Sequence, residues 1–388
     1  MMGAIEVFEN SRAVEQLREL PSSEPLAFHR RLPGYAPTPL LDVPVLARAM
    51  GVGSVLVKDE TNRLGLPAFK ILGASWAVYR ALEAHRGAFA EWETVDHLAA
   101  ELAQSGLVLV AATDGNHGRA VARMAGMLGL DALIFVPQDM VPARRAAFAD
   151  EGADVVVVDG SYDDAVVRSA EAADVDPDDR HVLVSDTSWP GYVDVPGAVI
   201  DGYSTLLTEI DDALAARGGR NPDVVFVQVG VGAFAAAVTR HYRRPECPSP
   251  PRLVSVEPTR AACVLESQRA GRIVTLPGSH HSIMSGLNCG TPSHLAFPVL
   301  QECVDVFCAI EDGVARDGMR ALSTAGIRAG ECSGGGVGAA LQLLAAGADP
   351  AWRATLGAGP DSCVLLFLTE GVTDPDAYDA IVVERRTS

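Results

Sequence analysis

Lysine is rare in this chain, and one of its two lysines has the surroundings of a nucleophile. Only Lys58 and Lys70 occur among 31 basic residues, so arginine occupies nearly every position where a positive charge suffices. Arginine stays protonated, whereas a primary amine can lose its proton and form a Schiff base with a carbonyl. Lys70 lies in Pro67-Ala68-Phe69-Lys70-Ile71-Leu72, whose apolar residues can desolvate the amine. Alternatively, Lys70 has no special role and was retained by chance, or it forms a structural ion pair. For Lys58, in Val57-Lys58-Asp59-Glu60, an ion pair is the better interpretation.

A polar turn follows the apolar run Leu107–Ala112. It consists of Thr113-Asp114-Gly115-Asn116-His117-Gly118 and leads into an alanine-rich segment that we expect to be helical. The N–H groups of such a turn can hold an anion such as a carboxylate, and Asn116 can donate a hydrogen bond to a phenolate-like oxygen. Asp114 adds a carboxylate where a substrate would enter. Taken alone, the pattern also fits an ordinary strand-to-helix turn with a capping residue.

A second turn, of small residues, follows Val224–Val229. Its sequence, Gly230-Val231-Gly232-Ala233-Phe234-Ala235, lets the backbone approach a phosphate and presents a helix N-terminus to it. The turn also matches Gly-x-Gly-x-x-Ala, the dinucleotide fingerprint, and the next apolar run ends in Glu257, where such a fold binds ribose. A nicotinamide-dependent oxidoreductase is therefore an alternative.

A hydroxyl completes the set of candidate groups. Thr369 follows the apolar run Val364–Leu368. A hydroxyl at a strand end can hydrogen-bond a neutral ring nitrogen without protonating it, although a capping role is the simpler alternative. An amine, an Asn/Gly turn, a phosphate-binding turn and a hydroxyl match the aldehyde, ring oxygen, phosphate and ring nitrogen of pyridoxal phosphate. A nicotinamide cofactor would leave Lys70 and Asn116 without a role.

Short apolar runs must position these residues. They alternate with helical stretches rich in Ala, Arg and Leu, which predicts buried, mostly parallel sheets covered by helices on both faces. Eight or more strands are more than we expect in a single sheet of this chain. The predicted fold class is therefore α/β with two lobes. One lobe would contain the runs between 107 and 186, and the other the runs after 224. Ligands bind at the carboxyl ends of such strands, where the turns lie. The expected strands are Val55–Val57, Leu107–Ala112, Ala132–Val136, Val155–Val158, Val182–Val184, Val224–Val229, Leu253–Val256 and Val364–Leu368.

Composition argues against several classes of protein. The 388 residues carry a net charge of −19, which disfavours a nucleic acid or an anionic membrane as partner. No apolar run approaches the roughly 20 residues that cross a bilayer, and Met1–Leu20 lacks a signal-peptide pattern, so we expect a cytoplasmic protein. The seven cysteines include no Cys-x-x-Cys pair, and no histidine pair has metal-ligand spacing, so we expect neither a disulfide framework nor a zinc site.

The chain resembles the fold type II, or tryptophan-synthase-β-like, pyridoxal-phosphate enzymes, and within them the diaminopropionate ammonia-lyases. The longest matching segment runs from Val57-Lys58-Asp59-Glu60 to Phe69-Lys70-Ile71-Leu72-Gly73. The matching segments keep their order across nearly the whole chain: 38–41, 57–73, 113–118, 186–192, 230–233, 283–290 and 369–371.

The resemblance implies roles in binding pyridoxal phosphate. Lys70 would be the Schiff-base lysine, Asn116 would bind the phenolic oxygen, and Thr369 would face the pyridine nitrogen. The phosphate would be held by the backbone N–H groups of Gly230, Val231, Gly232, Ala233 and Phe234.

It also implies a substrate and a reaction. Lys70 would take the Cα proton from the L-isomer of 2,3-diaminopropionate and Asp114 that from the D-isomer. Thr113 and Asp114 would contact the substrate, and Asp186 would recognise one of its amino groups. β-Elimination would then release ammonia and pyruvate.

The same resemblance implies a domain organisation. Residues 1–85 and 197–388 would form a large domain that binds pyridoxal phosphate, and residues 86–196 a small mobile domain that carries the Asn116 loop. The usual assembly of the family is a homodimer.

Departures from the family pattern keep other reactions open. Asp114 replaces the small hydroxyl residue common in serine/threonine dehydratases and cysteine synthases, and Cys332-Ser333-Gly334-Gly335-Gly336 differs from the expected Glu-Ser-Gly-Ala run. A β-replacement enzyme or a serine/threonine dehydratase is therefore the main alternative. An NAD-dependent oxidoreductase is more distant, as is a catalytically silent ligand-binding relative, which would have no need to keep Lys70.

Overall fold

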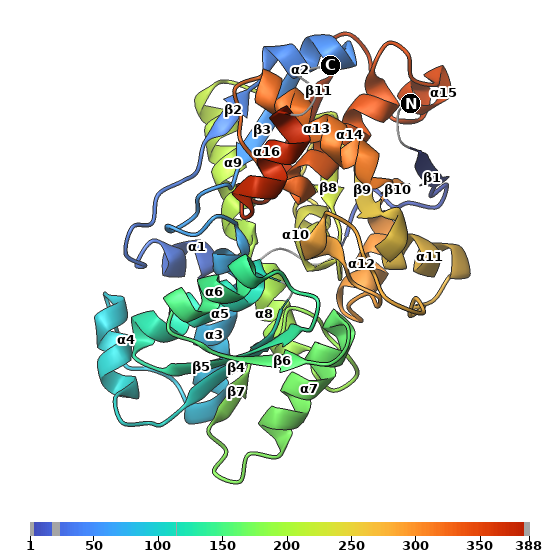
Figure 1. The fold of residues 1–388 in the computed structure, drawn as a ribbon. Coiled ribbons are helices and arrows are strands. Elements are labelled where there is room, and N and C mark those ends of the chain that lie inside the picture. Colours follow the sequence, from blue (N-terminus) through green and yellow to red (C-terminus); the bar gives the residue numbers. More distant parts are fainter. Residues whose placement is uncertain (1–3, 18–23, 114, 384–388) are drawn as a thin grey trace.

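The computed structural model describes residues 4–17, 24–113 and 115–383, which form two lobes (Figure 1). Within these residues the larger lobe contains a seven-stranded sheet of order β1-β10-β9-β8-β11-β3-β2. The edge strands β1 and β2 run antiparallel to their neighbours, and the inner strands are parallel. The bounds are β1 (Ile5–Glu9), β2 (Leu40–Asp42), β3 (Ser54–Asp59), β8 (Val224–Gln228), β9 (Arg252–Pro258), β10 (Val306–Ile310) and β11 (Cys363–Leu368).

The smaller lobe is built on a parallel sheet of order β6-β5-β4-β7, four-stranded in the part of the chain that the structure describes. Its elements are β4 (Val108–Ala112), β5 (Asp131–Pro137), β6 (Asp154–Val158), β7 (His181–Leu183), α4 (Val95–Leu102), α5 (Asn116–Leu128), α6 (Pro142–Asp150) and α7 (Tyr162–Asp174).

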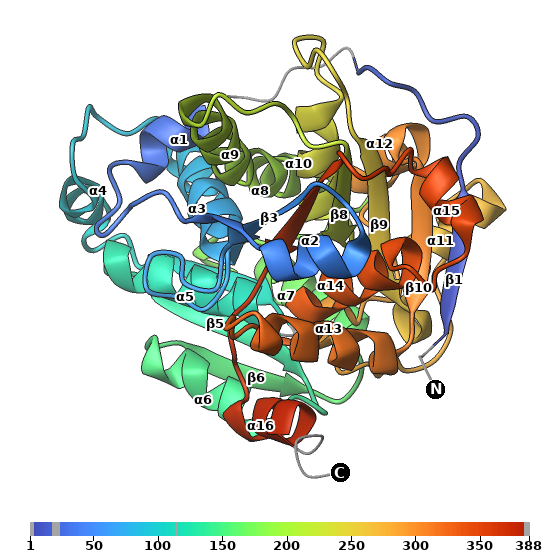
Figure 2. The same ribbon diagram turned by 90° about the horizontal axis from the view of Figure 1, so that it is seen from above.

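Helices cover both faces of the larger sheet, as Figure 2 shows from above. The inner strands are apolar throughout because both of their faces are buried: Val55 and Val57 of β3 pack in one core and Leu56 in the other. One face is covered by α2 (Pro44–Met50), α13 (Asp312–Thr324) and α14 (Glu331–Leu344). The other is covered by α3 (Lys70–Arg86), α8 (Asp194–Gly202), α9 (Ser204–Ala216), α10 (Ala233–Tyr242) and α12 (Ala296–Cys303), whose core continues into the smaller lobe. The remaining helices are α1 (Glu24–His29), α11 (Cys263–Ala270), α15 (Pro350–Thr355) and α16 (Pro375–Val383).

The prediction of two α/β sheets is confirmed, and each of the eight expected strands is present with ends shifted by at most two residues. The sequence pattern missed β1, β2 and β10. β2 has three residues, too few for a recognisable pattern, and β1 is a half-exposed edge strand. β10 is a continuous apolar run, Val-Phe-Cys-Ala-Ile, and the criterion used for the other strands could have found it.

Among the described residues, no helix has both the length and the apolar character to cross a membrane. In the same ranges, no three His, Cys, Asp or Glu side chains are grouped so that they could hold a metal ion. All seven cysteines are buried thiols.

Candidate active site

Lys70 is the first residue of α3, and its amine faces a carboxylate from the smaller lobe. Its Nζ lies 2.7 Å from Oδ2 of Asp186, which follows β7 in the sequence. The Tyr162 hydroxyl, from the first turn of α7, donates to the other oxygen, Oδ1, at 2.9 Å. Three distant segments therefore meet at one buried carboxylate.

The ion pair determines the charge of the amine. Burial is the largest single effect and alone would lower the pKa of Lys70. The negative charge of Asp186, the hydrogen bond to it and smaller contributions together outweigh burial, so the pKa is raised above its ordinary value. Burial, the largest single effect, opposes ionisation of Asp186 in turn. Nearby positive charge, chiefly that of Lys70, and the hydrogen bonds from Lys70 and Tyr162 together outweigh burial, so the pKa of Asp186 is lowered. The amine therefore stays charged despite its apolar neighbours, because Asp186 faces it. The neighbouring sequence could not show that this distant carboxylate lies there.

The turn between β4 and α5 places Asn116 close to this pair. Oγ1 of Thr113 accepts hydrogen bonds from the N–H groups of Gly115, at 2.9 Å, and Gly118, at 3.0 Å, and so holds the start of α5. Nδ2 of Asn116 donates to Oε2 of Glu370 at 2.9 Å. An amide nitrogen carries two hydrogens, so one N–H can still go to a ligand. Asp114, the carboxylate predicted to contact the substrate from this turn, lies outside the described residues.

The turn between β8 and α10 depends on its glycines. Gly232 has φ +103° and is the N-cap of α10, so no side chain caps the first N–H groups of the helix. A Cβ at Gly232 would lie 3.0 Å from Cδ1 of Leu300, and one at Gly230 would lie 3.2 Å from Sγ of Cys289. The backbone is thus closely packed on one side and presents N–H groups to an anion on the other.

Thr369 directly follows β11 and carries a buried polar atom that needs a partner. Its Oγ1 has no hydrogen-bond partner among the residues that the structure describes. A buried hydroxyl without a partner loses its hydration without compensation, so its position favours a hydrogen bond to a ligand.

These groups line a single pocket at the carboxyl ends of the strands, with walls from both lobes. Apart from Asp114, the structure therefore brings together every residue predicted to bind pyridoxal phosphate or the substrate. The members are Lys70, Thr113, Asn116, Asp186, Gly230, Val231, Gly232, Ala233, Phe234 and Thr369.

Other pocket residues were not predicted from the sequence. His117 and Glu370 directly follow Asn116 and Thr369, so adjacency to a predicted residue could have identified them. Nε2 of His117 donates to the carbonyl oxygen of Val184 at 2.8 Å, and burial lowers its pKa, so the ring is neutral. Tyr162 had no local signal, because it reaches the pocket only through the packing of α7.

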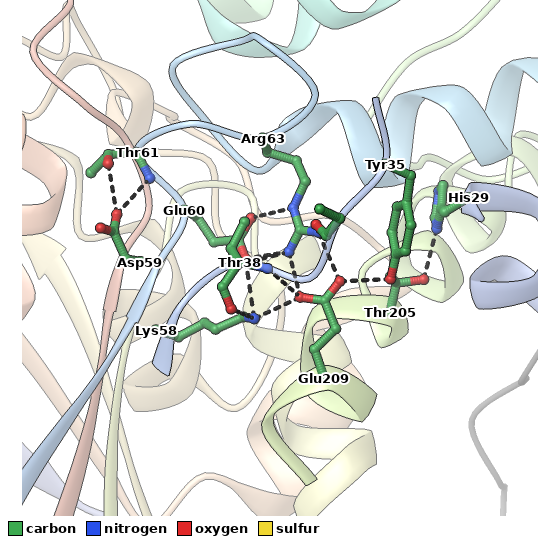
Figure 3. Close-up of polar contacts among 11 residues, drawn as sticks. His29, Tyr35, Thr38, Lys58, Asp59, Glu60, Thr61, Arg63, Thr205 and Glu209 are labelled. Atoms are coloured by element: carbon green, nitrogen blue, oxygen red, sulfur yellow. Dashed lines mark hydrogen bonds and ion pairs between the residues drawn. The ribbon is translucent and has the colours of Figure 1, made fainter. Parts of the chain in front are cut away.

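The second lysine lies in a buried charged cluster outside the pocket (Figure 3). Nζ of Lys58 is 2.6 Å from Oε2 of Glu209, and Nη2 of Arg63 is 2.7 Å from the same oxygen and 2.6 Å from Oε1 of Glu60. The side chains of Lys58, Glu60 and Arg63 are each 1% exposed. The predicted structural ion pair of Lys58 is confirmed, with its strongest partner far away in the sequence.

Glu257 contradicts the dinucleotide alternative. Its side chain is fully buried, and its oxygens accept hydrogen bonds from the backbone N–H groups of Val264 and Leu265, each at 2.8 Å. The carboxyl group therefore holds the start of α11 and cannot reach a ribose. The alternative in which Glu257 binds a ribose is therefore contradicted.

Comparison with known proteins points to one group. A family model described as "Pyridoxal-phosphate dependent enzyme" matches residues 31–355. The diaminopropionate ammonia-lyase of Escherichia coli K12 is 34% identical over 364 residues, which cover 92% of this chain and 90% of the relative. The crystal structure of the diaminopropionate ammonia lyase from Escherichia coli in complex with D-serine has a TM-score of 0.90 at 32% identity, covering 100% of this chain and 99% of that chain. The structure of that lyase with an aminoacrylate-PLP azomethine reaction intermediate has a TM-score of 0.87 at 32% identity and covers 100% of both chains.

Proposed function

The chain belongs to the family of pyridoxal-phosphate dependent enzymes, and from this premise we propose that it is a lyase acting on 2,3-diaminopropionate or a close β-substituted alanine. The observation that carries the proposal is the similarity to diaminopropionate ammonia-lyase, which extends over 92% of this chain. One molecule of diaminopropionate and one of water would give pyruvate and two molecules of ammonia.

The residues of the pocket fit pyridoxal phosphate. The Lys70 amine would bind the aldehyde, and the uncapped N-terminus of α10 after Gly230–Gly232 would bind the phosphate. The unpartnered Oγ1 of Thr369 would pair with the ring nitrogen, and Asn116 would donate to the ring oxygen. When bound, the cofactor would withdraw electrons from the Cα of the amino acid and make its hydrogen acidic.

The side chains of the pocket would then direct the proton and the charges. Lys70 would accept the Cα proton of the L-isomer and Asp114 that of the D-isomer. Asp186 would attract an amino group of the substrate, because a buried carboxylate binds an ammonium strongly. Thr113 would contact the substrate at the start of α5. Thr369 is neutral, so it would leave the ring nitrogen unprotonated, which favours elimination over transamination.

Substitution of Lys70 tests the cofactor assignment. The purified wild-type protein should show an absorption band at the border of the visible and ultraviolet ranges, which borohydride reduction and Lys70→Ala both abolish. Lys70→Arg should also lose the band and activity, since a guanidinium stays protonated and cannot form the bond. A fully active Lys70→Arg variant would contradict the proposal.

A substrate panel tests the reaction. Pyruvate and ammonia release should be fastest with D- or L-diaminopropionate and much slower with serine or threonine. If serine or threonine is preferred, the enzyme is a dehydratase. If an added nucleophile suppresses pyruvate in favour of a new amino acid, it is a β-replacement enzyme.

We further propose the division into a large domain of residues 1–85 and 197–388 and a small mobile domain of residues 86–196. It is supported by the order of the strands, since β4 to β7 all fall between residues 108 and 183. The cytoplasmic location and the homodimer expected from the sequence also stay predictions. Size-exclusion chromatography with light scattering measures the assembly state.

A further inference from the structure

Tyr203 packs against the helix that begins with Lys70. It lies between α8 and α9, and a Cβ added to Gly73 would lie 2.6 Å from its Cε1 and 2.7 Å from its Cζ. The phenol ring therefore occupies the space that a side chain at Gly73 would need. Because residues three apart share one face of an α-helix, the hydroxyl end of Tyr203 lies on the face of α3 that carries Lys70.

The ring cannot move away from this face. Tyr203 is fully buried, with its ring centroid 4.8 Å from that of Phe69 and 5.8 Å from that of Phe234. Phe69 directly precedes Lys70, and Phe234 belongs to the first turn of α10. The position of the hydroxyl is thus set by the same segments that form the pocket.

The hydroxyl of Tyr203 has unused hydrogen-bonding capacity next to the amine. It has no hydrogen-bond partner within the described ranges of the chain. Burial raises its pKa above the ordinary value, so it stays neutral, although the charge of Lys70 acts in the opposite direction. An oxygen acceptor is therefore held beside the ammonium.

The other acceptor of this amine has a competing task. Asp186 accepts from Lys70 on one oxygen and from Tyr162 on the other. A substrate ammonium bound to Asp186 would weaken the hydrogen bond between Asp186 and Lys70. The Lys70 amine must nevertheless face the Cα of the substrate. A second acceptor would keep the amine in place.

We propose that Tyr203 is a positioning residue for Lys70: its hydroxyl accepts a hydrogen bond from the lysine amine when the substrate occupies Asp186, and so directs the amine at the Cα proton. The inference rests on the proposed function, in which Lys70 is the base for the L-isomer. It adds a residue that acts through Lys70 without touching the substrate.

Tyr203→Phe tests this role, because it removes the hydroxyl and keeps the ring. With L-diaminopropionate, kcat should fall roughly fivefold to tenfold, about the effect of one lost hydrogen bond, while KM changes less than about twofold. With the D-isomer, kcat should stay at the wild-type value, because Lys70 is not its base. A general loss of structure would lower both rates alike.

Tyr242→Phe is the matched control. The Tyr242 hydroxyl is also buried without a hydrogen-bond partner in the described part of the chain, but Lys70 is not among the groups that influence it. Both variants should keep the thermal stability and the cofactor absorption band of the wild type. Only Tyr203→Phe should change the rate with the L-isomer.

A second measurement needs no catalysis. In the cofactor-free chain, the acetylation rate of Lys70 at fixed pH reports its unprotonated fraction, with the N-terminal amine as reference and the buried Lys58 as an unreactive site. The chain is labelled in saturating tetramethylammonium, a cation that cannot be acetylated and that would occupy Asp186 in place of the Lys70 amine. Losing the Tyr203 acceptor should then lower the Lys70 pKa, so labelling of Tyr203→Phe should be about twofold to fivefold faster than that of Tyr242→Phe.

The outcomes separate the two proposals. If the two variants show the same labelling rate and the same kcat with the L-isomer, the inference on Tyr203 is wrong while the proposed function stands. If the wild type has no absorption band that depends on Lys70, the proposed function itself fails.

Discussion

Replacing Lys58 by methionine removes one of two cations from a buried cluster that also contains two carboxylates. Lys58 Nζ lies 2.6 Å from Glu209 Oε2 and donates to the carbonyl oxygen of Thr38 at 2.9 Å. Arg63 binds both Glu60 and Glu209, so the four charges balance. In Lys58→Met the methionine fills the space of the lysine stem, but the cluster keeps an uncompensated negative charge in an apolar environment.

The expected loss of stability is large because the charge cannot reach water. Removing one member of a buried ion pair costs about 3–5 kcal/mol, a substantial part of the roughly 5–15 kcal/mol that stabilises a typical domain. Glu209→Gln in the Lys58→Met background leaves only the neutral pair of Arg63 and Glu60. The double variant should therefore be more stable than the sum of the two single effects predicts, by about 1–3 kcal/mol.

Urea unfolding followed by tryptophan fluorescence measures these differences. Arg168→Met is the control, because Arg168 pairs with Glu171 on the surface, with side chains 56% and 53% exposed. Its effect should stay below about 1 kcal/mol. The reasoning is refuted if Lys58→Met costs no more than Arg168→Met, or if the effects of Lys58→Met and Glu209→Gln are additive. Since the cluster lies outside the pocket, folded Lys58→Met should keep the cofactor absorption band that Lys70→Ala loses.

Two further substitutions test the cofactor turn and the acid sensitivity of the fold. Gly232→Ala should weaken cofactor binding at least about tenfold in an absorption titration, because alanine disfavours φ +103° and its Cβ would press on Leu300; Gly218→Ala, in an exposed turn at φ +61°, should leave binding unchanged. Burial lowers the pKa of His29 to about 3, so this neutral histidine stabilises the fold fully above about pH 6.5, and the contribution is lost towards pH 3 at about 1.4 kcal/mol per pH unit. His29→Gln should therefore lose less stability than the wild type between pH 6.5 and 4 in thermal melts, and an equally steep loss would contradict the assignment.

Much of the candidate site was predictable because its signals are local. A glycine turn directly after an apolar strand, as at Gly230–Gly232, reveals both the end of the strand and a possible anion site. Parallel strands then bring their carboxyl ends to one edge, so Asn116 and Thr369 meet in one pocket although they are far apart in the sequence. The resemblance of the ordered segments to fold type II enzymes then indicated which cofactor and which reaction these residues serve.

Pairings between charged residues were not predictable in the same way. Lys58 and Glu209 are 151 residues apart, and Lys70 and Asp186 are 116 residues apart. The chain has 50 acidic residues, and no local pattern marks Glu209 and Asp186 as the ones that hydrogen-bond its lysines. The positions of Tyr162 beside Asp186 and of Tyr203 beside α3 were not predictable either, because both depend on how distant helices pack.

The scarcity of lysine is a property of the sequence alone, and it singled out Lys58 and Lys70 before any fold was known. Their different roles were decided by the tertiary structure. Lys58 is 1% exposed and is held by Glu209, whereas Lys70 is 22% exposed at the wall of a pocket and is held by Asp186. Burial and charge pairing depend on segments that are distant along the chain and adjacent only after folding, so a side chain's own neighbours in sequence could not reveal which amine would face a ligand.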